Sequence, residues 1–349
     1  MKTEHANCVD GPLTIKTLKN GGVVAIPTET VYGLACLASN KKAFDALCQV
    51  KRRPADKPFS LMCSSVAEAV RYTTPNAKAV AVMKAFLPGE LTLLLKARPG
   101  MNQPHVDLNT GVVGIRVPNE KSVLSLIEEI GEPLLVTSAN ISGEEPAKDF
   151  QQTVAMFEGA IDLIVEGECG DGVPTTIIDL AGDEPKLVRE GKLRFDEIKT
   201  VYDAPPPSIA LGSDHGGFRY KEIIRFHLKE SGYDVIDEGT YSSMSCDYPE
   251  YAKAVSQDIV SGSVEFGILF CTSGIGISIA ANKVRGIRCG LGYCDEVVIK
   301  MREHNNANTI AFGQKYMEIN DVIRRVDMFL AGQASKSEKH VRRVNNLED

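Results

Sequence analysis

One cysteine stands where this sequence could place a reactive thiolate. Cys271 ends a short apolar segment and is followed by a glycine-rich run, Thr272-Ser273-Gly274-Ile275-Gly276, that opens a predicted helix. Glycines there allow backbone N–H groups to converge at a helix N-terminus, which favours negative charge and lowers the pKa of a thiol. A thiolate beside such donors can remove the proton next to a carbonyl and stabilise the resulting enediolate. This is the chemistry that converts an aldose to a ketose.

Two more polar clusters accompany this cysteine in the second half of the chain. Asp214-His215 follows a predicted strand, and His304-Asn305 precedes another. We expect all three clusters to lie where ligands bind. Taken alone, Cys271 could equally be a small buried residue that ends a strand, with the glycines merely turning the chain, because cysteine is often buried.

The elements that would position these clusters alternate along residues 208–349. Apolar patterning predicts strands over 208–213, 233–237, 266–271, 287–290 and 309–312. Helices are predicted after Gly217, over 249–261 and 277–284, from about Asp295, and over 320–330. This alternation predicts a doubly wound, parallel α/β sheet. Such a sheet binds its ligands at the carboxyl ends of the strands.

The first half of the chain is predicted to be a separate α/β domain with a mixed sheet. Strand-like segments cover 22–26, 59–63, 91–96, 113–117, 134–137 and 175–180, and helices are predicted over 41–50, 66–72, 77–86, 122–130 and 151–157. Three consecutive prolines, Pro205-Pro206-Pro207, suit neither a helix interior nor a central strand and favour a stiff spacer. The predicted organisation is a domain over 1–203, a linker over 204–207 and a second domain over 208–349.

Composition excludes several classes of protein. The formal net charge is −7 and both halves are acidic, so neither is a basic nucleic-acid binder and any RNA contact must be local or indirect. The nine cysteines are widely spaced and contain no CxxC pair, which argues against a disulfide framework and a zinc site and favours a reducing cytoplasm. No signal peptide is readable, and no apolar run approaches the ~18 residues of a membrane span.

The second half resembles ribose-5-phosphate isomerase B and the related galactose-6-phosphate isomerase subunits. The matching segments are 212–217, 238–241, 247–249, 271–283 and 302–305, and the resemblance covers nearly all of 208–349. It implies a Rossmann-like domain that converts ribose 5-phosphate to ribulose 5-phosphate through an enediolate and needs no cofactor.

The resemblance also implies roles for individual residues. Cys271 would be the base that moves a proton between C2 and C1, His304 would open the furanose ring, and Asp214 would handle the protons of the sugar hydroxyls. Ser273 and the 274–276 backbone would hold the enediolate. The other implied ligands of the sugar phosphate are His215, Tyr248, Gly274, Gly276, Asn305, Lys315, Lys339 and Arg343.

Two implied phosphate ligands depart from the family's pattern. Lys315 and Lys339 stand where relatives commonly have arginine, and lysine lacks the bidentate fork of arginine. The preferred sugar phosphate is therefore open, with galactose 6-phosphate as the alternative. The basic tail around Lys339, Arg342 and Arg343 is either a solvated face or, as the resemblance implies, a segment that reaches a neighbouring subunit. The second reading predicts a homodimer or a larger assembly.

A separate set of motifs lies in the first half: 27–34 (PTETVYGL), 51–54 (KRRP) with 57–58 (KP), 114–118 (GIRVP) and 137–143 (TSANISG). A charge run such as Lys51-Arg52-Arg53 is usually a solvated face, but it can also clamp a polyphosphate. Over about 10–200 the set resembles the YrdC-like family. The best-known activity of that family is synthesis of threonylcarbamoyl-AMP from L-threonine, bicarbonate and ATP, for a modification of tRNA.

This second resemblance implies a site without a nucleophilic side chain, because a carbamate formed from bicarbonate and the amine attacks the α-phosphorus itself. Positioning and charge neutralisation would carry the catalysis, and Mg²⁺ would arrive bound to ATP. Arg116 would pair with the threonine carboxylate. The implied ATP ligands are Lys51, Arg53, Ser138, Asn140 and Arg189, and the implied threonine ligands are Thr30, Arg116 and Thr175. Any contact with tRNA would be weak or indirect.

One position of the first half departs from that family. Met62 stands where relatives often have a histidine near the threonine pocket. The alternative to a synthase is therefore a YrdC-like module that only binds a nucleotide or double-stranded RNA.

Overall fold

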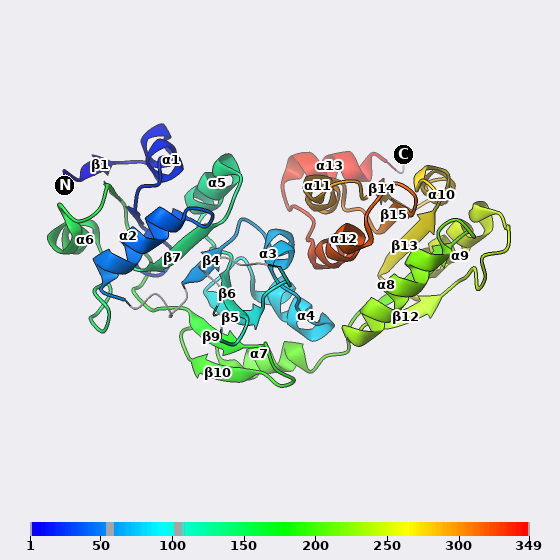
Figure 1. The fold of residues 1–349 in the computed structure, drawn as a ribbon, viewed down its shortest axis with the longest axis horizontal. Coiled ribbons are helices and arrows are strands. Elements are labelled where there is room, and N and C mark those ends of the chain that lie inside the picture. The colour runs from blue at the N-terminus through cyan, green and yellow to red at the C-terminus, as the bar shows by residue number, and fades with distance from the viewer. Residues whose placement is uncertain (1, 54–58, 101–106, 108, 348–349) are drawn as a thin grey trace. The chain divides into compact units, whose positions relative to one another are not determined.

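The structure is a computed structural model that describes residues 2–53, 59–100, 107 and 109–347 (Figure 1). The chain divides into two compact units, the first formed by residues 1–74 and 85–202 and the second by residues 75–84 and 203–349. Pro54, Lys57 and Pro58 of the sequence motifs lie outside the described residues. Each unit contains one sheet.

A ten-stranded mixed sheet organises the first unit, in the order β1-β8-β2-β3-β7-β4-β6-β5-β9-β10. Strands β4 and β6 pair in parallel whereas β3 and β7 pair antiparallel, which confirms the predicted mixed sheet. The strands are β1 (Glu4–Ala6), β2 (Val24–Ile26), β3 (Gly33–Leu37), β4 (Ser60–Met62), β5 (Leu91–Lys96), β6 (Val112–Arg116), β7 (Leu134–Ser138), β8 (Leu163–Val165), β9 (Thr176–Asp179) and β10 (Lys186–Arg189).

The helices up to residue 202 are α1 (Pro12–Lys19), α2 (Lys41–Lys51), α3 (Val66–Tyr72), α4 (Ala77–Phe86), α5 (Lys121–Ile130), α6 (Phe150–Phe157) and α7 (Phe195–Tyr202). Helices α1 and α5 share a core with β2, β3, β7 and β8. On α5 the buried residues Val123, Leu126 and Ile127 recur at helical spacing, so one face of the helix packs while the other stays polar. This packing fixes the strands whose ends carry the sequence motifs.

A five-stranded sheet organises the second unit, in the order β12-β11-β13-β15-β14, and all of its pairs are parallel. The predicted doubly wound fold is therefore confirmed. The strands are β11 (Ser208–Ser213), β12 (Asp234–Asp237), β13 (Phe266–Cys271), β14 (Cys289–Leu291) and β15 (Thr309–Gly313). The helices are α8 (Phe218–Glu230), α9 (Tyr248–Ser261), α10 (Ile275–Ala281), α11 (Asp295–Asn305), α12 (Ile319–Ala331) and α13 (Glu338–Asn345).

Helices cover both faces of this parallel sheet. Helices α9 and α10 pack on one face, where Val255 and Ile277 are buried with Ala210, Leu269 and Cys271. The opposite face carries α8 and α12, and there the rings of Phe270 and Phe312 stack at 5.8 Å. Strand β13 is buried along its whole length, as expected for a central strand covered on both faces.

Several elements were not predicted from the sequence. They are strands β1, β3, β8 and β10 and helices α1, α7 and α13. Helix α7 ends at Tyr202 and β11 begins at Ser208, so the proline run does join two regular elements. Helix α13 has no buried residue, and the sequence therefore shows no apolar stripe of the kind that predicts a helix packed on a core.

Candidate active sites

The carboxyl edge of the parallel sheet gathers two of the three polar clusters in the second unit. From β11 the chain moves outward to β12 and then crosses to β13 on the other side, so the strand order reverses between β11 and β13. Asp214 follows β11 directly, and Cys271 is the last residue of β13. A reversal of this kind is where open α/β sheets bind ligands.

Cys271 accepts a hydrogen bond from the loop that follows it. The backbone N–H of Gly274 donates to its sulfur at 3.0 Å, and the side chain is only 4% exposed. Gly274 has φ +81°, and a side chain there would lie 2.9 Å from the backbone of Phe312, so the position requires glycine. This hydrogen bond holds the Cys271 side chain against the loop that follows it. The sulfur therefore lies in a fixed position beside a glycine-rich loop at the end of the central strand.

Asp214 lies beside this loop. Its carboxylate accepts a hydrogen bond from the Gly217 N–H at 3.1 Å, and burial raises the pKa of the carboxyl group. Gly216 lies directly against Thr272, where a side chain would clash, so the two motifs are in contact. Nδ1 of His215 lies 3.2 Å from both the backbone nitrogen and the carbonyl oxygen of Cys246.

Tyr248 and Lys315 reach the same edge from other elements. The Tyr248 ring, at the start of α9, lies where a side chain on Gly276 would be. The backbone N–H of Lys315, just after β15, donates to the Thr272 carbonyl at 3.1 Å. The structure thus brings eight predicted residues to one edge: Asp214, His215, Tyr248, Cys271, Ser273, Gly274, Gly276 and Lys315.

The third cluster lies at the opposite edge of the sheet, whereas we expected all three at the carboxyl ends of the strands, where such sheets bind ligands. His304 and Asn305 end α11, which leads into the amino end of β15, whereas Cys271 pairs with Gly313 at the carboxyl end of that strand. The expectation overlooked that a cluster placed before a parallel strand belongs to the amino edge. Within one chain His304 and Cys271 are therefore kept apart by the length of a strand.

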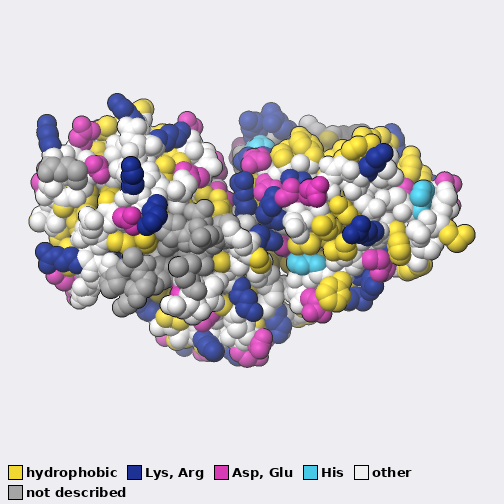
Figure 2. Space-filling view, in the orientation of Figure 1, with side chains coloured by type: hydrophobic (Ala, Val, Ile, Leu, Met, Phe, Trp, Pro, Cys, Tyr) yellow, Lys and Arg dark blue, Asp and Glu magenta, His cyan; other side chains and the backbone are white. Residues whose placement is uncertain are grey.

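His304 stacks on the C-terminal helix instead. Its ring lies 4.1 Å from that of His340 and nearly parallel to it, and partial burial together with the neighbouring His340 lowers the pKa of His304. Lys339 and Arg343 lie on the same helix, α13. Figure 2 shows Lys and Arg side chains gathered over the region of α13. Four predicted ligands therefore form a second, cationic group at the amino edge.

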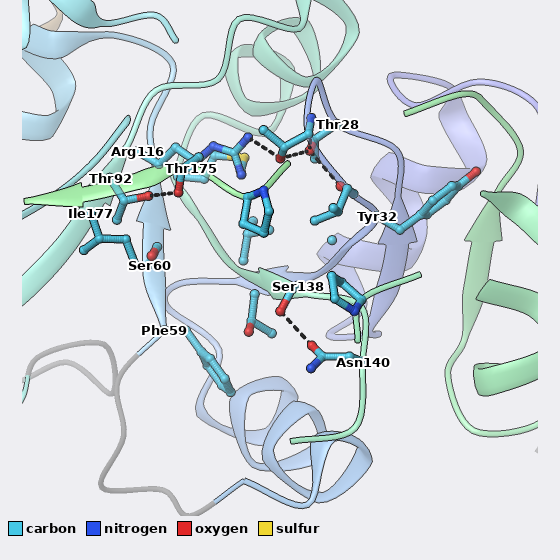
Figure 3. A pocket seen from close by; sticks show the side chains of 18 of the residues that line it. Thr28, Tyr32, Phe59, Ser60, Thr92, Arg116, Ser138, Asn140, Thr175 and Ile177 are labelled. Atoms are coloured by element: carbon cyan, nitrogen blue, oxygen red, sulfur yellow. Dashed lines mark hydrogen bonds between the residues drawn. The ribbon is translucent and has the colours of Figure 1, made fainter. Parts of the chain in front are cut away.

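The first unit contains a cavity of about 340 Å³ (Figure 3). Seven of the eight predicted residues of this half line it: Thr30, Arg53, Arg116, Ser138, Asn140, Thr175 and Arg189. They come from strand ends and connecting loops that lie far apart in the sequence. Figure 3 shows Arg116, Thr92 and Thr175 toward one side of the cavity and Ser138 and Asn140 toward another.

Arg116 is the centre of the first side. Its Nη2 donates to Thr30 Oγ1 at 3.0 Å and contacts Glu29 Oε1 at 2.9 Å. Its Nε is buried and has no hydrogen-bond partner among the described residues. A buried, unpaired guanidinium N–H is costly, so it indicates a place for an anion. The hydroxyls of Thr92 and Thr175 share a hydrogen bond of 2.8 Å nearby.

Lys51 is not a lining residue of this cavity. Its side chain is 1% exposed, and its ammonium donates to the carbonyls of Ser138 and Asn140 and to Asn140 Oδ1, at 2.5, 2.9 and 2.8 Å. Burial and the charge of Arg53 lower the pKa of Lys51 to about 8. All three donors are therefore used within the protein, and a phosphate could reach Lys51 only by displacing one of these acceptors.

This network leads to a prediction for stability. Lys51→Met leaves the buried acceptors on Ser138 and Asn140 without their donor, so the first unit should lose at least about 2 kcal/mol of its free energy of unfolding. Urea unfolding checks this, with Lys41→Met as the matched control. Lys41 begins the same helix with a 75% exposed side chain, and its loss should change stability by no more than about 0.5 kcal/mol. Equal free energies of unfolding for the two variants would contradict this role of Lys51.

Several lining residues were missed from the sequence. Thr92 is one polar residue inside the apolar strand β5, and that interruption was its signal. Phe59 also lines the cavity, with the Arg53 guanidinium 5.1 Å from its ring centre. Met62 lines the cavity with a fully buried side chain and offers no hydrogen-bond donor comparable to histidine. Glu29, which contacts the lining residue Arg116, was named in the sequence only as part of the motif at 27–34.

The described residues hold no group of three or more His, Cys, Asp or Glu side chains that could bind a metal ion. In the same part of the chain, no helix combines the length and apolar character needed to cross a membrane. All nine cysteines are free.

Fold and site together define two classes of domain: a mixed-sheet domain with a cationic, hydroxyl-lined cavity, and a Rossmann-like domain with a thiol at the switch point. The Sua5_yciO_yrdC family model, described as Telomere recombination, matches residues 16–191, and the LacAB_rpiB model, described as Ribose/Galactose Isomerase, matches residues 209–347. The chain belongs to the Sua5/YciO/YrdC family through its first part and to the ribose/galactose isomerase family through its second.

Individual relatives agree with this division. Threonylcarbamoyl-AMP synthase of Bacillus subtilis (strain 168) is 37% identical over 186 residues, which are 53% of this chain and 54% of that protein. The chain thus spans about half the length of that relative. Ribose-5-phosphate isomerase B of Escherichia coli (strain K12) is 43% identical over 142 residues, 40% of this chain and 93% of that protein. The crystal structure of E. coli YciO superposes with a TM-score of 0.50 at 30% identity, covering 55% of this chain and 96% of that one.

Proposed function

We propose that the chain is a bifunctional enzyme. Its second unit interconverts ribose 5-phosphate and ribulose 5-phosphate, and its first unit makes threonylcarbamoyl-AMP from L-threonine, bicarbonate and ATP. The isomerase half rests above all on one observation: the Gly274 N–H lies 3.0 Å from the sulfur of Cys271 at the switch point of the sheet, beside Asp214. The similarity to ribose-5-phosphate isomerase B supports ribose 5-phosphate over galactose 6-phosphate.

In this mechanism the Cys271 thiolate removes the proton from C2 of the open-chain aldose, and the electron pair moves toward the carbonyl oxygen to give an enediolate. The resulting thiol returns a proton to C1 while the C2 oxygen becomes the ketone. Backbone N–H groups of the 274–276 loop and the Ser273 hydroxyl stabilise the enediolate. Asp214 accepts and returns hydroxyl protons, a task suited to a carboxyl group whose pKa burial raises.

The site needs a second copy of the chain. His304, Asn305, Lys339 and Arg343 lie at the edge opposite Cys271, so they serve the Cys271 of a partner and not their own. Helix α10 offers an apolar face for such pairing, because Ile275 and Ile279 are more than half exposed one turn apart. The proposed assembly is a homodimer or larger, with His304 opening the sugar ring across the interface.

The synthase half rests on the buried, unpaired Nε of Arg116 in the cavity of the first unit. Arg116 binds the threonine carboxylate with Thr30 and Thr175 nearby. The amine and bicarbonate give a carbamate and water, a carbamate oxygen attacks the α-phosphorus of ATP, and pyrophosphate leaves. Arg53, Arg189 and Ser138 neutralise or bind the phosphates, and Mg²⁺ comes to the site bound to ATP. Lys51 and Asn140 hold this side of the cavity in shape.

The product would serve modification of tRNA, which this acidic chain meets weakly or through other proteins. Nine free cysteines fit a reducing cytoplasm. A non-catalytic nucleotide- or RNA-binding module is the alternative for the first unit. Release of pyrophosphate that requires both L-threonine and bicarbonate distinguishes the two, and its absence from well-folded protein would remove the synthase half of the proposal.

Arg116→Ala tests the carboxylate site. Loss of a charge-assisted pair should lower kcat/KM for L-threonine by about 10²-fold while the KM for ATP changes little. Arg194→Ala is the control, because Arg194 is 72% exposed and only reaches Asp196 at 3.9 Å. Steady-state assays of pyrophosphate release provide the measurement. An effect on ATP as large as that on threonine would place Arg116 at the nucleotide instead.

A further inference from the structure

Glu29 forms a buried ion pair with the cavity-lining Arg116. Oε1 of Glu29 lies 2.9 Å from Nη2 of Arg116, and the two side chains are only 12% and 11% exposed. The same oxygen accepts a hydrogen bond from the Asn119 N–H at 3.1 Å, so the carboxylate is held from a second segment of the chain. Its other oxygen is buried without a hydrogen-bond partner among the described residues. This carboxylate is built into the site.

The cavity has another arginine in a different electrostatic setting. Arg189 donates to the carbonyl and the hydroxyl of Thr175 and contacts no carboxylate among the described residues. Partial burial and the positive charge of Arg116 lower the pKa of Arg189, so the two guanidinium groups act on each other. Arg116 and Arg189 therefore line the same cavity, as Arg53 does, and of Arg116 and Arg189 only Arg116 faces a carboxylate among the described residues.

This asymmetry sorts anions by charge. A guanidinium that already faces a carboxylate still offers N–H donors to a monoanion, but the nearby negative charge repels a polyphosphate several times more strongly than a single carboxylate. A guanidinium that is hydrogen-bonded only to neutral oxygens attracts a polyphosphate without this opposing repulsion. We infer that Glu29 is a specificity-determining residue: it reserves Arg116 for the carboxylate of the amino acid and directs the phosphates of the nucleotide to Arg189. The inference rests on the proposed synthase function.

The experiment measures binding of magnesium-free inorganic pyrophosphate and of L-threonine to the full-length chain by calorimetry. Glu29→Gln keeps the size of the side chain and an acceptor oxygen but removes the charge. It should bind pyrophosphate about tenfold more tightly than wild type, and pyrophosphate should then displace L-threonine. In wild type the two ligands should bind independently. Glu129→Gln, an exposed glutamate on α5, should behave like wild type.

A gain of affinity is informative because damage to the fold cannot produce it. Unchanged pyrophosphate affinity in a folded Glu29→Gln protein, or continued independent binding, overturns the inference. If that variant does not fold, Arg189→Gln takes its place: it should weaken pyrophosphate about tenfold and spare L-threonine, and the reverse pattern overturns the inference. Wild type without threonine-dependent pyrophosphate release, together with the predicted gain in Glu29→Gln, would refute the synthase proposal and leave the sorting role of Glu29 standing.

Discussion

Cys271→Ala is expected to lower kcat for conversion of ribose 5-phosphate by about 10³-fold or more, with the fold and the dimer intact. The alanine removes the base but leaves the 274–276 loop, so substrate binding should change far less than turnover. A coupled assay of ribulose 5-phosphate formation measures kcat, and circular dichroism checks the fold.

A second cysteine of the same unit supplies the control. Cys294 precedes α11, is half-buried and makes no side-chain hydrogen bond as a cap, so Cys294→Ala should keep nearly full activity. The pair of variants separates loss of the base from general sensitivity to cysteine removal. Turnover near the wild-type rate in Cys271→Ala would refute the assignment of the base, whatever Cys294→Ala does.

Mixing two inactive variants is expected to restore isomerase activity. Cys271→Ala lacks the base and His304→Ala lacks the ring-opening group, so each homodimer is inactive at both sites. In a mixed dimer one site combines an intact Cys271 with an intact His304 of the partner. Random exchange makes half of the dimers mixed, each with one working site of two, so activity should approach about a quarter of wild type.

The two variants are mixed in equal amounts, left to exchange subunits, and assayed over time. Recovery would show that the amino-edge and carboxyl-edge groups act across an interface, as their separation within one chain requires. No recovery, with mass measurements confirming that mixed dimers exist, would mean that His304 and Cys271 do not cooperate across subunits. The second unit would then need a different source for its ring-opening group.

The second unit was largely predictable because its strands and helices alternate with clear apolar patterns and its motifs sit at strand ends. The amino edge as the place of His304 follows from its position before a predicted parallel strand, but its contact with His340 was not predictable, because His340 lies on α13, a helix that the apolar pattern does not indicate. In the first unit β3 escaped prediction because Gly33-Leu34-Ala35-Cys36-Leu37 is buried throughout and shows no alternation. Small residues such as glycine and alanine also have weak strand propensity.

For the candidate site in the first unit, the sequence predicted most of the residues but not the contacts between them. Arg116, Thr30 and Thr175 could be named from motifs, but the pairing of Arg116 with Glu29 depends on how the turn after β2 meets the end of β6. Lys51 shows the opposite case. Its place in a basic run suggested exposure to a phosphate, whereas the fold buries it beneath Asn140, because a helix end and a strand end converge there.

Both sheets belong to one continuous chain, so an assembly that pairs two copies of the second unit also brings together two copies of the first. The proposed dimer therefore carries two copies of the first unit. Two copies that each bind a common partner weakly then bind it more tightly together, because the first contact raises the effective concentration for the second. The fusion would in this way give avidity to a domain whose own surface is acidic and poorly suited to grip RNA.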